Sequence, residues 1–178
     1  MKHNKTVMDK EGLDRSLTRM AYEILEKNKG VEDLVFVGIR TRGVFLAQRL
    51  RDKISDTEKT EIPLGILDIT LYRDDIKSSQ PKPLLGKTEI PFSIDDKKVI
   101  LVDDVLFTGR TIRAAMDALI DFGRPKMIQL AVLVDRGHRE LPIRADFVGE
   151  NLSSLQGEEI LVHLTEKDGS DEIVLEIK

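Results

Sequence analysis

The fold is decided by the stretch Val99-Ile100-Leu101-Val102-Asp103-Asp104-Val105-Leu106-Phe107-Thr108-Gly109-Arg110-Thr111. Its first four residues are apolar without alternation, which is typical of a parallel-sheet strand that is buried on both faces. Two acids follow at the carboxyl end of this strand, the edge at which open α/β sheets bind ligands. From Arg110 onward apolar residues recur at helical spacing, so a helix is predicted to begin here with its free N–H groups facing the same edge.

Each part of this stretch suits a different part of a phosphorylated sugar. An ionised carboxylate accepts hydrogen bonds from vicinal hydroxyl groups, so Asp103 and Asp104 suit a ribose. The hydroxyls of Thr108 and Thr111 can join backbone N–H groups around a phosphate, and Gly109 allows a close approach. The alternative interpretation, an acidic turn with a threonine that caps a helix, fits the acid pair alone but not the complete pattern.

Apolar patterns along the rest of the chain predict strands that alternate with helices. An amphipathic helix is predicted from Lys10 to Asn28, with Gly30 as its stop. The other predicted elements are strands at 34–38, 64–70, 99–102, 127–134, 145–148, 160–164 and 172–177, and helices that begin near 44 and 110. This alternation predicts an α/β fold with a central parallel sheet flanked by helices, in which the last two strands form a cap.

Two further segments are candidate binding loops. Gly38 and Gly43 bracket Arg40, Thr41 and Arg42, which supply two cations, a hydroxyl and backbone N–H groups suited to a diphosphate. A tight turn with solvated arginines is the alternative interpretation of these residues. Residues 71–91 are polar and contain three prolines, and a loop of this length inside a domain is usually a lid or a binding loop, although it could also hide a hairpin.

Composition limits the classes of function. The 178 residues fit one domain, and 40% hydrophobic with 34% charged residues is typical of a globular protein. Cysteine is absent, which excludes disulfides, thiolate metal sites and a cysteine nucleophile, so a bound metal would have oxygen ligands. No apolar run of membrane-spanning length and no signal-like start is present, so we expect a cytoplasmic protein with no membrane partner. The net charge of −4 argues against nucleic-acid binding by the whole surface and leaves a local basic patch open.

The stretch Val99 to Thr111 resembles the phosphoribosyl pyrophosphate (PRPP) binding motif of type I phosphoribosyltransferases. The resemblance implies that fold, with a small hood formed by the N-terminal segment and residues 135–178 and a flexible flap at 71–91. It also implies that Asp103 and Asp104 contact the ribose hydroxyls, that 105–111 surround the 5′-phosphate, and that Arg40, Thr41 and Arg42 hold pyrophosphate. Mg²⁺ would be held mainly through PRPP, with Asp103 and Asp104 as its candidate protein ligands, and Arg73 of the flap would reach the diphosphate when the flap closes.

Three other segments narrow the resemblance. Residues 16–19, 67–75 and 133–146 are similar to the bifunctional pyrimidine-operon attenuation regulators that are also uracil phosphoribosyltransferases. This family implies a glycosyltransferase of pyrimidine salvage that converts uracil and PRPP to UMP and pyrophosphate with Mg²⁺. It further implies UMP-dependent binding of pyrimidine-operon leader mRNA, which promotes transcription termination, by a homodimer or a higher homo-oligomer. An RNA regulator with little enzyme activity, and a phosphoribosyltransferase for another base without RNA binding, are the alternatives.

The resemblance also assigns residues to the acceptor base and to RNA. Uracil would lie near Asp135, Ile160 and Leu161. The residues that would face RNA are Thr18, Arg19, His138, Arg139 and Arg144. Purine-type relatives carry a carboxylate three residues after the second acid, and this chain has Phe107 there, so no general base is available at that position. Glu150 stands where the family commonly has a basic residue, which predicts a weaker or shifted RNA contact.

Overall fold

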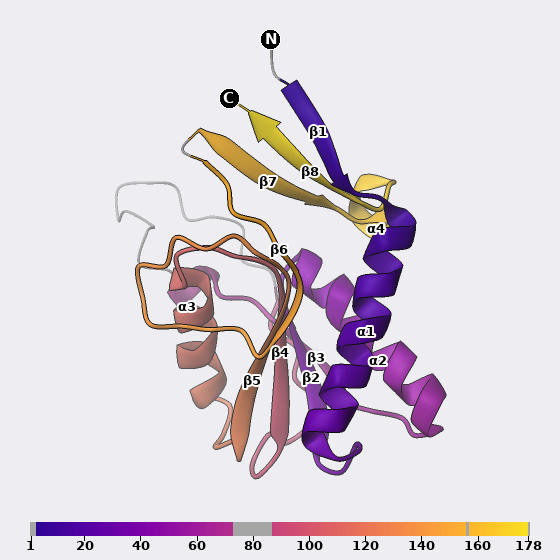
Figure 1. Ribbon diagram of the computed structural model, residues 1–178. Helices are drawn as coiled ribbons and strands as arrows, with labels where there is room; N and C mark the ends of the chain where they lie inside the picture. The colour runs from indigo at the N-terminus through magenta and orange to yellow at the C-terminus, as the bar shows by residue number, and fades with distance from the viewer. Residues whose placement is uncertain (1–2, 73–86, 156, 178) are drawn as a thin grey trace.

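The computed structural model describes residues 3–72, 87–155 and 157–177. Its centre is a five-stranded, all-parallel sheet with the strand order β3-β2-β4-β5-β6 (Figure 1). The strands span Leu34–Ile39 (β2), Leu64–Leu67 (β3), Lys98–Leu106 (β4), Met127–Asp135 (β5) and Phe147–Asn151 (β6). The predicted α/β fold with a central parallel sheet is confirmed.

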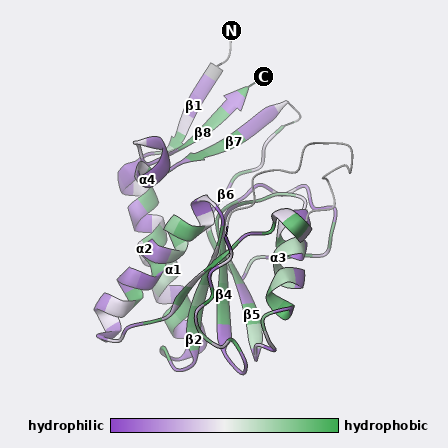
Figure 2. Ribbon diagram, turned by 180° about the vertical axis from the view of Figure 1, so that it is seen from behind, coloured by the Kyte–Doolittle hydropathy of each residue, from purple (hydrophilic) through white to green (hydrophobic). Residues whose placement is uncertain are grey.

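Helices cover both faces of this sheet. Helices α1 (Lys10–Asn28) and α2 (Arg42–Glu58) lie on one face, and α3 (Arg110–Ile120) lies on the other (Figure 1). Along β4, Ile100 and Val102 pack in the core beneath α1 and α2, while Val99 and Leu101 pack in the core beneath α3. The strand is apolar without alternation because both of its faces are buried. In Figure 2, which colours residues by hydropathy, hydrophobic residues run along the strands between the helix layers.

Helix α1 has the bounds that the sequence predicts. Its buried side chains, Leu13, Leu17, Met20, Ala21 and Ile24, recur every three or four residues on one face. Asp9 caps its start, since the side-chain Oδ1 accepts a hydrogen bond from the N–H of Gly12 at 2.8 Å. No helix in the described part of the chain is both long and apolar enough to cross a lipid bilayer.

A second, three-stranded antiparallel sheet lies beyond the carboxyl ends of the parallel strands (Figure 1). It has the order β1-β8-β7, with β1 at His3–Met8, β7 at Glu158–His163 and β8 at Glu172–Ile177. A short helix, α4 (Thr165–Asp168), joins β7 to β8. The two strands predicted to form a cap are β7 and β8. The predicted hood, the N-terminal segment with 135–178, is too wide, because β6 belongs to the parallel sheet and the C-terminal contribution to the second sheet begins at β7.

The segment predicted as a flap lies mostly outside the described residues, and Arg73 is among those not described. A 3-10 turn at Thr70–Tyr72 leads toward this segment. Near the end of the predicted flap, the N–H and carbonyl groups of Glu89 are each hydrogen-bonded to Ile66 at 2.8 Å, an antiparallel bridge on the outer edge of β3. The described residues on the two sides of 73–86 therefore lie near β3 and the carboxyl edge of the sheet.

Candidate active site

A polar cavity of about 480 Å³ lies at the carboxyl ends of β2, β3 and β4. The last residue of β2, the segments that follow β2 and β3, the final part of β4 and the first turn of α3 line it. The lining residues are Ile39, Arg40, Thr41, Arg42, Asp68, Ile69, Thr70, Asp103, Asp104, Val105 and Thr111. The cavity thus brings together the acid pair, the glycine-bracketed loop 38–43 and Thr111.

The acid pair lies within β4 rather than after it. Strand β4 continues to Leu106, so the predicted strand end at Val102 is four residues too early. Asp103 is only 7% exposed, and its Oδ1 accepts the N–H of Asp104 at 2.9 Å. Burial raises the pKa of the Asp103 carboxyl well above its usual value, and the neighbouring Asp104 raises it further. The cavity therefore has one deeply buried and one half-buried carboxyl group at its base.

Residues Val99 to Val102 do not line the cavity. Their side chains are at most 1% exposed and pack in the two cores, so this part of the motif supports the site without touching a ligand. Of the residues that follow Asp104, Val105 and Thr111 line the cavity. Leu106 is buried, and Phe107 is partly exposed outside the lining.

The turn between β4 and α3 is shaped by Gly109 and Thr108. Gly109 precedes α3 with φ +94°, a conformation that favours glycine. The Thr108 hydroxyl accepts the N–H of Arg110 at 3.3 Å. The Arg110 side chain points to another loop, where its Nε donates to Glu140 Oε2 at 2.8 Å. The Thr108 and Arg110 side chains are therefore engaged at the loop itself rather than in the cavity.

The loop between β2 and α2 packs directly on β4. A Cβ atom on Gly43 would lie 2.5 Å from the carbonyl oxygen of Val102 and 3.2 Å from Cα of Asp103, so only glycine allows this approach. The peptide bond between Arg40 and Thr41 is cis. Arg40 donates through Nη2 to the carbonyl oxygen of Lys87 at 2.5 Å, which links the loop to the first residue described after 73–86. The backbone of 40–43 is thus held against the acid pair.

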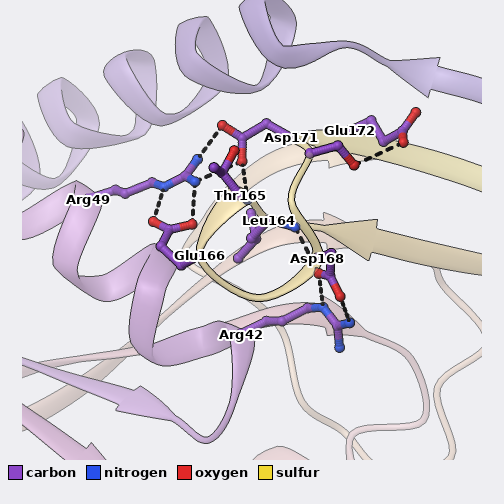
Figure 3. A network of polar contacts seen from close by, with 9 residues as sticks. Arg42, Arg49, Leu164, Thr165, Glu166, Asp168, Asp171 and Glu172 are labelled. Atoms are coloured by element: carbon purple, nitrogen blue, oxygen red, sulfur yellow. Dashed lines mark hydrogen bonds and ion pairs between the residues drawn. The ribbon is translucent and has the colours of Figure 1, made fainter.

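The Arg42 side chain contacts the second sheet (Figure 3). Its Nε and Nη2 donate to the two carboxylate oxygens of Asp168 at 3.1 and 2.8 Å, a bidentate ion pair. The Arg42 hydrogen bonds lower the pKa of Asp168. Oδ2 of Asp168 also accepts the N–H of Leu164 at 2.9 Å, which orders the short helix α4. Arg42 also lines the cavity, and its predicted contact with pyrophosphate stays a prediction, while its guanidinium group in this structure is paired with Asp168 of α4.

Arg49 makes a second link seven residues further along α2 (Figure 3). Its guanidinium group donates to both oxygens of Glu166, at 2.8 and 2.5 Å, and to both oxygens of Asp171, at 3.2 and 2.8 Å. The Arg49 hydrogen bonds lower the pKa of Glu166. Burial raises the pKa of Asp171, but the hydrogen bonds from Arg49 and Thr165 outweigh it and the net shift is downward. Two arginines on one face of α2 therefore hold the turn of the second sheet.

Asp68 and Thr70 line the cavity, and neither was among the predicted site residues. Oδ1 of Asp68 accepts the N–H of Thr70 at 2.9 Å and its hydroxyl at 2.5 Å, so the two residues form a closed turn after β3. The available signal was positional. Asp68 lies near the carboxyl end of the strand predicted at 64–70, which in the structure ends at Leu67, and an acid at that end of a parallel strand lies at the same sheet edge as Asp103.

The residues predicted to bind the base lie outside the cavity lining. The Asp135 carboxylate at the end of β5 accepts Arg139 Nη2 at 2.6 Å and the N–H of Gly137 at 2.9 Å. Ile160 is buried in the core beneath α1 and α2, and Leu161 on β7 is half-buried. Binding of uracil by these three residues stays a prediction.

The residues predicted to face RNA are divided between two places. Thr18 and Arg19 lie on α1, where Arg19 pairs with Glu23 at 2.7 Å and donates to the carbonyl oxygens of Val148 and Gly149 at 3.1 and 2.5 Å. The other three lie in the connection between β5 and β6. There His138 Nε2 is 2.8 Å from the Ser154 carbonyl oxygen, Arg139 makes several internal hydrogen bonds, and Arg144 is exposed. RNA binding by these residues also stays a prediction.

The carboxylates of the cavity suit a hard cation whose coordination shell is completed by a bound ligand. Asp68, Asp103 and Asp104 offer oxygen atoms, the donors that Mg²⁺ prefers. Among the described residues, no cluster of three or more histidine, cysteine or acidic side chains could hold a metal ion by itself. The donor set therefore fits a Mg²⁺ ion that takes most of its ligands from a bound diphosphate and water.

Comparison of the sequence with known proteins gives a consistent result. Residues 3–166 match the model of the phosphoribosyl transferase domain. The chain is 60% identical to the bifunctional protein PyrR of Geobacter sp. strain M21 over 176 residues, which cover 99% of both chains. It is 56% identical to the bifunctional protein PyrR of Deinococcus radiodurans, over 96% of this chain and 93% of that protein.

Comparison of the structure agrees at the level of the fold. A hypoxanthine-guanine phosphoribosyltransferase of Bacillus anthracis superposes with a TM-score of 0.73 over 98% of both chains, at 21% sequence identity. The hypoxanthine phosphoribosyltransferase of Trypanosoma cruzi gives a TM-score of 0.70 at 19% identity, over 96% of this chain and 95% of that one. The chain therefore belongs to the phosphoribosyl transferase domain family and, within it, to the bifunctional PyrR proteins.

Proposed function

We propose that this protein transfers a phosphoribosyl group from PRPP to uracil, giving UMP and pyrophosphate, and that it regulates a pyrimidine operon by UMP-dependent binding of the leader mRNA. The observation that carries the enzymatic half is the cavity itself, which joins two carboxyl groups on β4 to the glycine-bracketed loop 38–43 and to Thr111. The 60% identity to a bifunctional PyrR protein along the whole chain supports both halves.

The ligand groups are assigned by chemistry. Asp103 and Asp104 accept hydrogen bonds from the two ribose hydroxyls, and the turn 107–111 supplies N–H groups and the Thr111 hydroxyl to the 5′-phosphate. Since Arg42 is paired with Asp168, the diphosphate contacts from loop 40–43 fall mainly on backbone N–H groups and on Arg40. Bound Mg²⁺ would neutralise the charge of the diphosphate, with Asp103, Asp104 and Asp68 as its candidate protein ligands.

The reaction breaks the bond between the anomeric carbon and the pyrophosphate oxygen and forms a bond from the same carbon to N1 of uracil, which loses its proton. Positive charge develops on the sugar ring in the transition state, and the carboxyl groups of Asp103 and Asp104 hold that ring in position by its hydroxyls. Phe107 occupies the place where purine-type relatives carry a carboxylate. Its exposed ring lies 4.1 Å from the Arg136 guanidinium group, so position 107 has a packing role.

One assay separates this proposal from its alternatives. Purified protein is incubated with labelled uracil, PRPP and Mg²⁺, and UMP is measured, with hypoxanthine and orotate as competing bases. We expect UMP formation that neither competitor reduces. Formation of another nucleotide in preference to UMP would contradict the uracil assignment.

The regulatory half is tested by binding of a pyrimidine-leader RNA with and without UMP. We expect tighter binding with UMP, and a leader with scrambled sequence serves as the control. RNA binding without UMP formation would instead support an RNA regulator with little enzyme activity, an alternative that Phe107 favours. The resemblance further supports a homodimer that acts in the cytoplasm with PRPP, uracil, UMP and mRNA as partners, and sedimentation equilibrium should give twice the chain mass of 20.2 kDa.

A further inference from the structure

The connection between β5 and β6, residues 136–146, is attached to the turn between β4 and α3. Three consecutive carbonyl groups, of the last residue of β4 and the first two residues of the turn, accept hydrogen bonds from the connection. Leu106 accepts the N–H of Arg136 at 2.9 Å, Phe107 accepts Arg139 Nη1 at 2.9 Å, and Thr108 accepts the N–H groups of Glu140 and Leu141 at 2.9 and 3.1 Å. The segment that carries three of the predicted RNA residues thus shares hydrogen bonds with the turn proposed to hold the 5′-phosphate.

These hydrogen bonds determine which way the peptide groups of the turn face. In a trans peptide the carbonyl and the following N–H point in opposite directions. Because the carbonyls of 106–108 point toward the connection, the N–H groups of 107–109 point away from it. These are N–H groups that the proposed function assigns to the 5′-phosphate of the nucleotide. The connection therefore fixes the orientation of residues 106–109, the phosphate turn, through hydrogen bonds on the side opposite the proposed phosphate.

Arg139 is the side chain that joins the parts of this arrangement. Its Nη2 donates to Asp135 Oδ2 at 2.6 Å, its Nε to the carbonyl oxygen of Ile143 at 2.9 Å, and its Nη1 to that of Phe107 at 2.9 Å. The side chain is 23% exposed, and all three of its nitrogen atoms are engaged. A guanidinium group in this state is a poor partner for an RNA phosphate. It ties the end of β5, the phosphate turn and the far end of the connection to each other.

We infer that Arg139 is a positioning residue that couples occupancy of the 5′-phosphate site to the conformation of residues 138–144. This inference rests on the proposed function. A phosphate that accepts hydrogen bonds from the N–H groups of 107–109 polarises those peptides and strengthens the hydrogen bonds that their carbonyls accept. Nucleotide binding thereby tightens the connection and orders its RNA-facing residues. By linkage, RNA that selects the ordered connection raises the affinity for UMP by the same factor.

The decisive variant is Arg139→Lys, which keeps the positive charge but cannot make the three-way set of hydrogen bonds. The dissociation constant of the leader RNA is measured with and without saturating UMP, after calorimetry has established that each variant binds UMP. The quantity compared is the dissociation constant without UMP divided by that with UMP. We expect this ratio to be about 5 to 150 for the unchanged protein, the common range of coupling between sites, and close to one for Arg139→Lys. If Arg139 only contacted RNA phosphates, lysine would retain much of the affinity and leave the ratio unchanged, and that result would overturn the inference.

Arg144→Gln is the matched control. Arg144 is exposed and makes no hydrogen bond or ion pair with the other described residues. Its loss should weaken RNA binding by the same factor with and without UMP, so the ratio stays that of the unchanged protein. A fall in the ratio for Arg144→Gln as large as that for Arg139→Lys would show that any cation of the connection sets the ratio, and would also count against Arg139 as the coupling residue.

Hydrogen exchange tests the same coupling without RNA and without a variant. The N–H groups of Arg136, Glu140 and Leu141 donate to the carbonyls of the phosphate turn, so their exchange should slow when UMP binds. If the RNA experiment failed because the protein binds no RNA, the proposed regulatory function would be wrong, while slowed exchange would still support coupling within the protein. Exchange at these three amides that is unaffected by bound UMP would refute the inference, whatever RNA does.

Discussion

Two loops that meet at the acid pair are anchored by different kinds of contact. The loop after β2 is tied to its surroundings by charged side chains, Arg42 to Asp168 and Arg40 to the Lys87 carbonyl. The turn after β4 is tied mainly by backbone groups, whose carbonyls accept N–H groups of the β5–β6 connection. The strength of an ion pair depends on pH, because the carboxylate titrates, and on salt, which screens the charges. A hydrogen bond between backbone groups depends on neither. The diphosphate side of the site should therefore respond to solution conditions that leave the 5′-phosphate side unchanged.

The largest effect is expected at the acid pair, where the two loops meet. The double variant Asp103→Asn with Asp104→Asn removes two charge-assisted contacts to the ribose, each worth about 1.5–3 kcal/mol. We expect kcat/KM for UMP formation to fall about 10²- to 10⁴-fold. The control is Asp117→Asn, which changes an exposed acid on α3. Retained turnover in the double variant would reject the assignment of the pair to the ribose.

Replacing one glycine in each loop tests how rigidly each is held. A Cβ atom in Gly43→Ala would lie 2.5 Å from the Val102 carbonyl oxygen, so backbone must move beside Asp103, and we expect a loss of about 1–3 kcal/mol of stability with a clear loss of activity. Gly109→Ala meets neighbours at 3.4 Å and costs only its left-handed backbone, about 1–2 kcal/mol. Urea unfolding and steady-state kinetics measure both. A larger loss of activity in Gly109→Ala would contradict the difference between the loops.

Acid should release the second sheet before it affects the phosphate turn. The pKa values of Asp168 and Glu166 are lowered by Arg42 and Arg49, and the same carboxyls in an unfolded chain titrate near 3.9 and 4.3. Their contribution to stability is complete above about pH 5 and is lost as the pH falls through the lowered folded values. Hydrogen exchange against pH should show faster exchange in α4 than at Glu140 and Leu141.

The variant Arg49→Met isolates the part of this pH dependence that comes from α2. It leaves Glu166 and Asp171 without their cation, so we expect about 1–2 kcal/mol lower stability at pH 7 and a shallower dependence of stability on pH between about 5 and 3. The control is Arg15→Met, which changes a 72% exposed arginine on α1. An unchanged slope in Arg49→Met would show that the acid sensitivity arises elsewhere.

The smallest effect is expected for the salt dependence of RNA binding at the protein surface. If four phosphates of single-stranded RNA are contacted, the logarithm of affinity should fall with the logarithm of salt concentration with a slope of about −3. Glu150 lies on β6, next to the Gly149 carbonyl that Arg19 contacts. Glu150→Lys should tighten RNA binding and make the slope steeper by about 0.7. An unchanged slope would place the RNA away from β6.

The sequence predicts what depends on local periodicity and strand order. The apolar residues of α1 recur at helical spacing and predict its bounds, and the run Val99 to Val102 predicts the central strand because burial on both faces demands it. The position of Asp103 at the cavity follows from the general rule for the carboxyl edge of parallel sheets. Local pattern and general topology therefore suffice for the fold class and for the centre of the candidate site.

What the sequence does not predict depends on partners far along the chain. Arg42 and Arg139 are each consistent with a free cation in the sequence, and each is paired in the structure, with Asp168 and with Asp135. Strand β1 is largely polar and exposed, and it is a strand because it pairs with β8. Such pairings arise from three-dimensional proximity across 126 residues in the case of Arg42 and Asp168, which one sequence without relatives does not reveal.

The pairing of β1 with β8 also governs the order in which the chain can fold as it is made. Thr6 pairs with Val174, so β1 has no strand beside it until the last part of the chain has left the ribosome. Since synthesis proceeds at about 5–20 residues per second, β1 waits on the order of five to twenty seconds between the completion of β3, when the parallel sheet can begin to form, and the completion of β8. During this interval the second sheet does not exist, and Arg42 has no Asp168 to bind. The parallel sheet that carries the site therefore forms first, and the ion pair between Arg42 and Asp168 forms last.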